Sequence, residues 1–145
     1  AARIAAPAQL LAELPGADVV LLCSPHTPET ENMANAAFFA AMAPHALFMN
    51  LGRGALVDET ALVAALDAGR PAFAALDVTR TEPLPADSPL WQHPKIAITP
   101  HDSSDTPGTV TGADDTFLAN LALYLAGKPM KHLVDPAAFA AGPSA

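Results

Sequence analysis

Four short apolar runs decide what this chain can fold into. They lie at residues 18–23, 46–50, 72–78 and 95–99, and each contains β-branched or aromatic side chains. The runs are too short for a stable helix, and their hydrophobicity is nearly continuous instead of alternating with polar residues. Runs of this kind are typical of strands in a parallel sheet whose two faces are both covered by helices.

Helix-type segments separate these runs. One spans residues 35–42 and another spans residues 58–68, in which Asp58 is a candidate N-cap and Gly69 a candidate stop. Strands and helices therefore alternate along the chain. This order predicts an α/β fold: a doubly wound parallel sheet of about four strands, with flanking helices and right-handed crossovers.

The prolines mark the part of the chain that follows the third run. Residues 79–94 hold four of the fifteen prolines, which predicts an ordered loop instead of a strand or helix. A last helix is predicted to begin with Thr106 as N-cap and Pro107 as its first residue, and to end at Gly127. We expect one compact unit.

Charge and composition exclude several classes of partner. The 15 acidic and 7 basic residues give a net charge of -8, which disfavours nucleic acids and anionic membrane surfaces. No apolar run approaches the roughly 18 residues of a membrane helix, and the first residues lack the layout of a signal peptide, so we expect a cytoplasmic protein. Cys23 is the only cysteine and is predicted to be a buried, unreactive side chain. The histidines lack the spacing of metal ligands, so no metal site is predicted.

Polar residues gather where the predicted strands end. Arg53 follows the second run, Asp77 and Glu82 come at and after the end of the third, and His101 follows the fourth. In parallel α/β sheets, function sits just beyond the carboxyl ends of the strands. Loops of any α/β protein are polar, however, so the residues alone leave an ordinary loop rim open as the alternative.

The sequences of these loops resemble those of the D-isomer-specific 2-hydroxyacid dehydrogenases. The similar segments are Ser-Pro-His-Thr-Pro-Glu-Thr at 24–30, Asn-Leu-Gly-Arg-Gly-Ala-Leu-Val-Asp-Glu at 50–59, Ala-Leu-Asp-Val-Thr-Arg-Thr-Glu-Pro-Leu-Pro at 75–85, Ser-Pro-Leu-Trp at 88–91 and Ile-Thr-Pro-His at 98–101. They stand in the family's order and at its spacing. The resemblance implies a partial Rossmann-type fold, in which residues 1–136 are the C-terminal portion of a dinucleotide-binding domain, followed by a tail at residues 137–145.

The resemblance also implies a set of catalytic roles. It places the family's catalytic arginine at Arg53, its glutamate at Glu82 and its acid/base histidine at His101. A guanidinium is a planar, permanently charged fork that suits the carboxylate and carbonyl of a small 2-keto acid. A protonated imidazole delivers the proton that the reduced carbonyl oxygen needs, and a carboxylate on its other nitrogen orients the ring. The implied activity is that of a glyoxylate/hydroxypyruvate-type reductase.

The same resemblance implies NAD or NADP as cofactor and a homodimer as the assembly. It places Asp77 near the nicotinamide carboxamide, and Pro25, Thr27 and Asn50 along the cofactor. A purely structural role stays open for three of these residues, because Asp77 also suits loop capping and Pro25 and Thr27 suit ordinary turns.

The chain departs from the family chiefly by what it lacks. None of its eight glycines form the Gly-x-Gly-x-x-Gly loop that holds a pyrophosphate. By the strand order of that family, the run at 18–23 would pair with the strand that precedes this loop, so the resemblance implies that the run lies at an open sheet edge here, which invites association. The alternative function is therefore a catalytically silent α/β module that associates through this edge. Smaller departures are Thr79 and Arg80, where an aromatic and an acidic residue are commoner, and Asp102.

Overall fold

The computed structural model describes residues 4–134, in two compact units that divide after Asp102, where one compact unit was expected from the sequence. In the first, the elements are the 3-10 helix η1 (Pro7–Gln9), α1 (Leu10–Glu13), η2 (Leu14–Gly16), β1 (Val19–Leu22), α2 (Ala36–Ala41), β2 (Leu47–Asn50), η3 (Gly54–Leu56), α3 (Glu59–Asp67), β3 (Phe73–Leu76), η4 (Pro89–Gln92) and β4 (Ile96–Ile98). The second unit contains α4 (Pro107–Leu125).

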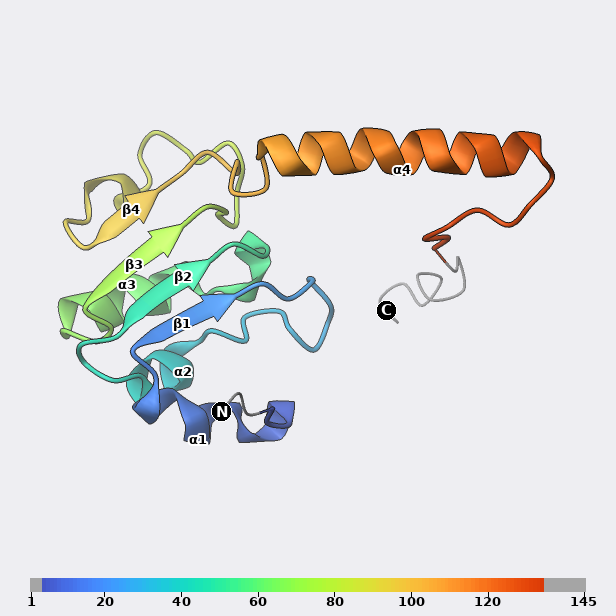
Figure 1. Ribbon diagram of the computed structural model, residues 1–145. Coiled ribbons are helices and arrows are strands. Elements are labelled where there is room, and N and C mark those ends of the chain that lie inside the picture. The colour runs from blue at the N-terminus through green and yellow to red at the C-terminus, as the bar shows by residue number, and fades with distance from the viewer. Residues whose placement is uncertain (1–3, 135–145) are drawn as a thin grey trace. The chain divides into compact units, whose positions relative to one another are not determined.

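The four apolar runs form one parallel sheet, which confirms the predicted fold class. The strand order is β1-β2-β3-β4, so each strand pairs with the next along the chain (Figure 1). Val19 pairs with Leu47, and Leu47 in turn pairs with Phe73. Because all four strands run the same way, the loops that follow them gather at one end of the sheet.

The predicted helix signals act as expected. Asp58 caps α3 by accepting from the Ala61 amide, and Asn35, which the sequence did not mark as a cap, caps α2 by accepting from the amides of Ala37 and Phe38. Gly69 follows α3 with a φ of 85°, a left-handed conformation that glycine adopts without a steric penalty. Two helix boundaries are thus fixed by the residues that the sequence singles out.

The core lies between the sheet and the helices α2 and α3. Phe38 and Phe39 of α2 pack edge-to-face with Phe48 of β2, with ring centroids 5.1 to 6.0 Å apart. Leu62 and Leu66 of α3 are fully buried in the same cluster. Burying aromatic and leucine side chains contributes about 1.5–3 kcal/mol each, so this layer is the main source of stability for the first unit.

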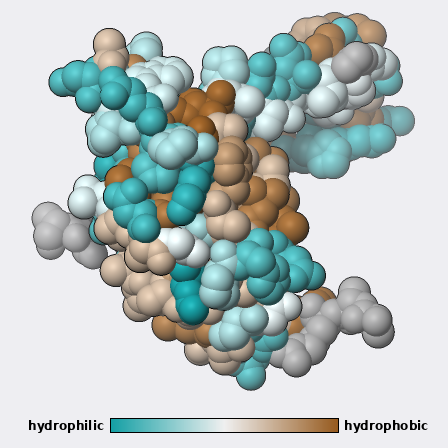
Figure 2. Space-filling model, turned by 90° about the vertical axis from the view of Figure 1, so that its left-hand side faces the viewer, coloured by the Kyte–Doolittle hydropathy of each residue, from teal (hydrophilic) through white to brown (hydrophobic). Residues whose placement is uncertain are grey.

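One expectation about the sheet is wrong for residues 4–102. The nearly continuous runs predicted helices on both faces, but alternate residues of the strands remain accessible, with Val19 54%, Leu21 48% and Phe73 38% exposed. Since strand side chains alternate between faces, α2 and α3 cover one face of this unit only. Cys23, predicted to be buried, is exposed, because it follows β1 at the edge of the sheet. Hydrophobic residues also reach the surface beside hydrophilic ones in Figure 2.

The loop after β3 contains one short element that the sequence did not predict. Pro89 begins η4, and the Ser88 side chain accepts from the amide of Leu90. The indole of Trp91 donates to the Pro85 carbonyl at 3.0 Å. The rest of residues 79–94 is irregular, as the prolines predicted. The short helical turns of residues 7–16 were likewise not predicted.

In the second unit, α4 begins and ends where the sequence indicates. The Thr106 hydroxyl accepts from the Thr109 amide at 3.1 Å, and Gly127 follows the helix with a φ of 63°. The Asn120 side chain bonds both backbone groups of Lys131, which returns the chain along the helix. The predicted boundary at residue 136 and the tail at 137–145 lie outside the described residues. Within residues 4–134, no helix is both long enough and apolar enough to cross a membrane.

Candidate active site

Three loops bring the predicted catalytic residues together. Arg53 follows β2, Glu82 follows β3 and His101 follows β4, and all three line one cavity of about 210 Å³. The strand order alone makes these loops neighbours, because β2, β3 and β4 are adjacent. The spatial convergence on which the sequence-based hypothesis depends is therefore present.

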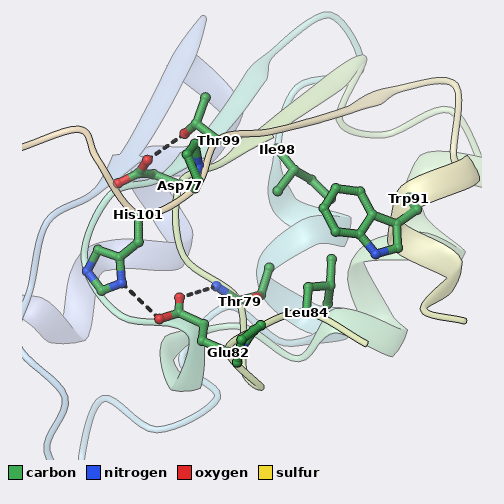
Figure 3. A pocket seen from close by; sticks show the side chains of 10 residues that line it. Asp77, Thr79, Glu82, Leu84, Trp91, Ile98, Thr99 and His101 are labelled. Carbon is green, nitrogen blue, oxygen red and sulfur yellow. Dashed lines mark hydrogen bonds and ion pairs between the residues drawn. The ribbon is translucent and has the colours of Figure 1, made fainter. Parts of the chain in front are cut away.

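His101 and Glu82 form a directed pair. The His101 Nδ1 lies 2.8 Å from the Glu82 Oε2, and the Thr79 amide donates to the Glu82 Oε1 at 3.0 Å (Figure 3). The bonds from His101 and Thr79, and then the charges of His101 and Arg53, lower the pKa of Glu82 below its ordinary value of 4.5. Partial burial opposes this shift. Glu82 is therefore an anion near neutral pH, held in place at both oxygens, and it engages one ring nitrogen of His101.

Asp77 fixes the turn that carries His101. His101 has a φ of 59°, in the left-handed region, which is uncommon for a non-glycine residue. The buried Asp77 carboxylate accepts from the Thr99 hydroxyl and, at 3.1 Å, from the Asp102 amide. These contacts lie on both sides of His101. The loop-capping role that the sequence left open for Asp77 is thus present, and a contact with the cofactor stays a prediction.

A second cavity, of about 490 Å³, adjoins this turn. Figure 3 shows side chains from the β3 and β4 loops around it. Its lining combines apolar residues with the polar groups of the rim: Asp77, Thr79, Glu82, Pro83, Leu84, Trp91, Ile98, Thr99, Pro100 and His101. Because His101 lines both cavities, a molecule bound in either one can approach the imidazole.

The turn that presents Arg53 is held by Asn50. The fully buried Asn50 side chain donates to the Arg53 carbonyl at 2.9 Å and accepts from the Gly52 amide at 3.1 Å. A Cβ at Gly54 would lie 2.0 Å from the Thr79 carbonyl, so only glycine fits where the two loops touch. The Asn50 amide thus has a structural role in the turn. Its contact with a cofactor stays a prediction.

The loop after β1 is shaped by local hydrogen bonds. The Thr27 amide donates to the Thr30 hydroxyl at 2.8 Å, and that hydroxyl donates to the Pro25 carbonyl at 2.9 Å. These bonds are the ordinary turn chemistry that the sequence left open for Pro25 and Thr27. Their predicted contacts with a cofactor therefore stay predictions.

Sequence reasoning missed two residues of the rim, His26 and Arg80, which line the cavity of Arg53 and His101. The sequence alone suggests no more than a surface or loop role for His26. The available signal was its position in the loop that follows the first apolar run, which is the same reasoning that found Arg53. Among residues 4–134, no group of three or more His, Cys, Asp or Glu side chains could hold a metal ion.

The fold and rim together define a Rossmann-type α/β domain with an Arg, a Glu–His pair and a cavity at the strand ends. Comparison with known proteins narrows this class. The model of the D-isomer specific 2-hydroxyacid dehydrogenase NAD binding domain matches residues 2–103. The chain belongs to this family, which confirms the resemblance seen in the sequence.

The relatives include curated reductases and solved structures. Glyoxylate/hydroxypyruvate reductase B of Citrobacter koseri is 46% identical over 123 residues, which are 85% of this chain and 38% of that protein. Glyoxylate/hydroxypyruvate reductase A of Serratia proteamaculans is 41% identical over 127 residues, 88% of this chain and 40% of that protein. The chain therefore spans about two fifths of the length of these curated relatives.

Two crystal structures extend the likeness to three dimensions. A D-isomer specific 2-hydroxyacid dehydrogenase from Xanthobacter autotrophicus, in complex with NADPH and MES, is 39% identical with a TM-score of 0.79, covering 91% of this chain and 54% of that one. An NADPH-dependent glyoxylate/hydroxypyruvate reductase from Sinorhizobium meliloti, in complex with NADP and sulfate, is 32% identical with a TM-score of 0.79. The match covers 91% of this chain and 43% of that one.

Proposed function

We propose that this chain carries the catalytic residues of an NAD- or NADP-dependent oxidoreductase that interconverts a small 2-keto acid and its 2-hydroxy acid. The substrate class is that of glyoxylate and hydroxypyruvate, the substrates named for the relatives. The observation that carries the proposal is the meeting of Arg53, Glu82 and His101 around one cavity at the strand ends.

Arg53 is assigned to binding and polarisation of the substrate. Its guanidinium donates in a fixed plane, so it can hold the carboxylate and the adjacent carbonyl oxygen together. As the carbonyl is reduced, negative charge grows on its oxygen, and a donor already in place stabilises that charge at no cost of reorganisation. The turn held by Asn50 supports such a fixed placement.

His101 is assigned to proton transfer. In the reductive direction, the protonated ring gives its proton to the carbonyl oxygen, and the C=O group becomes a C–OH group. In the oxidative direction, the neutral ring takes the proton back. Because Glu82 engages Nδ1, the nitrogen left for the substrate is Nε2. Glu82 thereby orients the ring.

The cofactor assignment rests on the larger cavity. A bound nicotinamide cofactor supplies the hydride that the carbonyl carbon receives. The cavity of about 490 Å³ fits a flat ring, since it offers an apolar wall at Leu84 and Ile98 and polar groups at Asp77 and Thr99. Asp77 is assigned to the carboxamide. Pro25, Thr27 and Asn50 are assigned to the rest of the cofactor, whose pyrophosphate has no glycine-rich loop in this sequence.

A direct assay tests the proposal. The chain is assayed alone and after addition of the part of the Citrobacter relative that precedes the matched segment, which is intended to supply the glycine-rich loop. Loss of NADH or NADPH absorbance with glyoxylate or hydroxypyruvate is the expected result in the complemented sample, and His101→Asn should abolish it. If the complemented sample binds NADPH but turns over neither acid, the proposed reaction is wrong.

The second candidate function is association without catalysis. It is favoured by β1, which lies at the edge of the sheet with Val19 and Leu21 exposed. An unpaired strand edge offers a row of backbone donors and acceptors to another chain. The predicted homodimer is one form that such association could take. The assay above separates the two candidates, because a silent module gives no turnover with either acid.

A further inference from the structure

Arg80 links three loops of the rim, although the catalytic roles proposed above leave it unused. Its Nη1 lies 3.3 Å from the Glu31 Oε1 in the loop after β1. Its Nη2 donates to the Asn32 side-chain oxygen and, at 3.3 Å, to the Ala55 carbonyl in the turn after β2. Arg80 itself belongs to the loop after β3. One guanidinium thus holds all three loops.

The backbone of Arg80 adds a further constraint. Its amide donates to the Glu59 Oε1 at 2.6 Å, which ties the loop to the first turn of α3. The Thr79–Arg80 peptide also presses against Gly54, where a Cβ would come within 2.4 Å of the Arg80 nitrogen. The position of Arg80 is therefore fixed from both its amide and its side chain.

The acceptors of Arg80 lie next to residues that line the cavity. Ala55 is two positions after Arg53, and Glu82 is two positions after Arg80. The second oxygen of Glu31 accepts from the His26 Nε2 at 2.9 Å, and the His26 ring lines the cavity with Arg53 and His101. Two of the three side-chain contacts of Arg80, with Ala55 and Glu31, thus lead to the cavity.

The loop after β1 contains a residue in an uncommon backbone conformation, and the contacts of Arg80 help to stabilise it. Asn32 has a φ of 51° in the left-handed region, which asparagine tolerates better than most residues. Its amide donates to the Ala55 carbonyl at 2.9 Å, the same oxygen that Arg80 contacts. The bonds from His26 and Arg80 also lower the pKa of Glu31 below its ordinary value, so Glu31 is anionic near neutral pH and able to join the two.

We propose that Arg80 is a positioning residue: it sets the spacing between the Arg53 turn, the His26 loop and the Glu82 loop, and so shapes the cavity in which the substrate is held. This inference rests on the proposed function for its catalytic consequence. The guanidinium acts through Glu31, Asn32 and Ala55, and it has no assigned contact with substrate.

The first test is the complemented enzyme assayed with glyoxylate. Arg80→Met should lower kcat/KM on the order of 10²-fold, the cost typical of a displacement of about 1 Å at a catalytic group. Arg80→Lys should recover only part of this loss, because an ammonium lacks the planar fork that bridges three acceptors. Arg70→Met is the matched control, since Arg70 also donates to a carbonyl, that of Ala40, and lies outside the cavity. It should leave kcat/KM near the wild-type value.

A double-mutant cycle separates positioning from general destabilisation. Glu31→Gln and Arg80→Met break the same contact, so their effects on kcat/KM should be clearly less than additive. Fully additive effects, or an unchanged kcat/KM in Arg80→Met, would overturn the inference while leaving the proposed function standing.

A readout without catalysis keeps the two proposals distinguishable. In the 145-residue chain, the side-chain carboxyl carbon of Glu31 is titrated by NMR. Its pKa should lie below the ordinary value and should rise in Arg80→Met, but not in Arg70→Met. If this response is seen and the complemented enzyme has no turnover, the proposed function fails and the link between loops stands. If Glu31 does not respond, the inference about Arg80 is wrong.

Discussion

The role proposed for Arg53 requires the planar shape of its guanidinium as well as its positive charge. Arg53→Lys keeps the positive charge and removes the planar fork, so we expect kcat/KM of the complemented enzyme to fall by about 10²-fold, as for other losses of a fixed charge-stabilising donor. Steady-state rates with glyoxylate measure this. Arg70→Lys is the control, because the Arg70 guanidinium donates to the Ala40 carbonyl and lies outside the cavity that Arg53 lines. An unchanged rate would remove Arg53 from the mechanism.

Glu82 makes the stability of the chain depend on pH. Its pKa is lowered in the folded state, mainly by the bond from His101. A depressed carboxyl pKa stabilises the fold above the unfolded-state pKa, and this contribution is lost as pH falls through the folded-state pKa. We therefore expect Glu82→Gln to be less stable than the wild type at pH 7, and the difference to be smaller at an acidic pH below 4.5, as the pH falls through the lowered folded-state pKa. Urea unfolding at both pH values measures it, and a difference independent of pH would contradict this account.

At the scale of elements, the close contact between the β2 and β3 loops depends on a glycine, Gly54, at the point where they meet. In Gly54→Ala, the new Cβ would meet the Thr79 carbonyl at 2.0 Å, so η3 or the β3 loop must shift. We expect a loss of about 1–3 kcal/mol in unfolding free energy, as in other overpacked sites. Gly16→Ala is the control, because nothing lies within 4 Å of that position. Equal stability of the two variants would show that the loops are not in contact.

Much of this architecture could be predicted because its causes are local. The cap Asp58 and the stop at Gly69 act within a few residues, and apolar runs reveal strands without knowledge of their partners. The strand order then places Arg53 and His101 on one rim. Their proposed roles came from the family's motifs, since residue types alone left a plain polar rim open.

The features that escaped prediction depend on contacts far apart in the chain. The Arg80 guanidinium contacts Glu31 across 49 positions, and the Arg80 amide donates to Glu59 across 21. No periodicity or local motif encodes such pairs. The open sheet face was also missed, because a continuous apolar run shows that both faces are hydrophobic and says nothing of whether this chain supplies the helices that cover them.

At the scale of the whole molecule, the open face of the sheet and its edge strand β1 favour association with a partner. Val19, Leu47 and Phe73 stand in one register row on the open face, and Leu21 and Met49 occupy the next. An apolar patch beside an unpaired strand edge favours association with another chain. We therefore expect the chain to self-associate when it is alone in solution, and sedimentation velocity over a range of concentrations measures this.

A matched pair of charge substitutions locates the association. Leu21 of β1 and Leu11 of α1 are 48% and 49% exposed, so replacing either by lysine adds one charge at a site of equal accessibility. Only Leu21 lies on the open sheet at its edge strand, where a charged side chain opposes edge-to-edge pairing. Leu21→Lys should therefore shift the chain toward monomer, and Leu11→Lys should not. If both variants sediment like the wild type, the chain associates through another surface or not at all, and the silent-module alternative loses the observation that favours it.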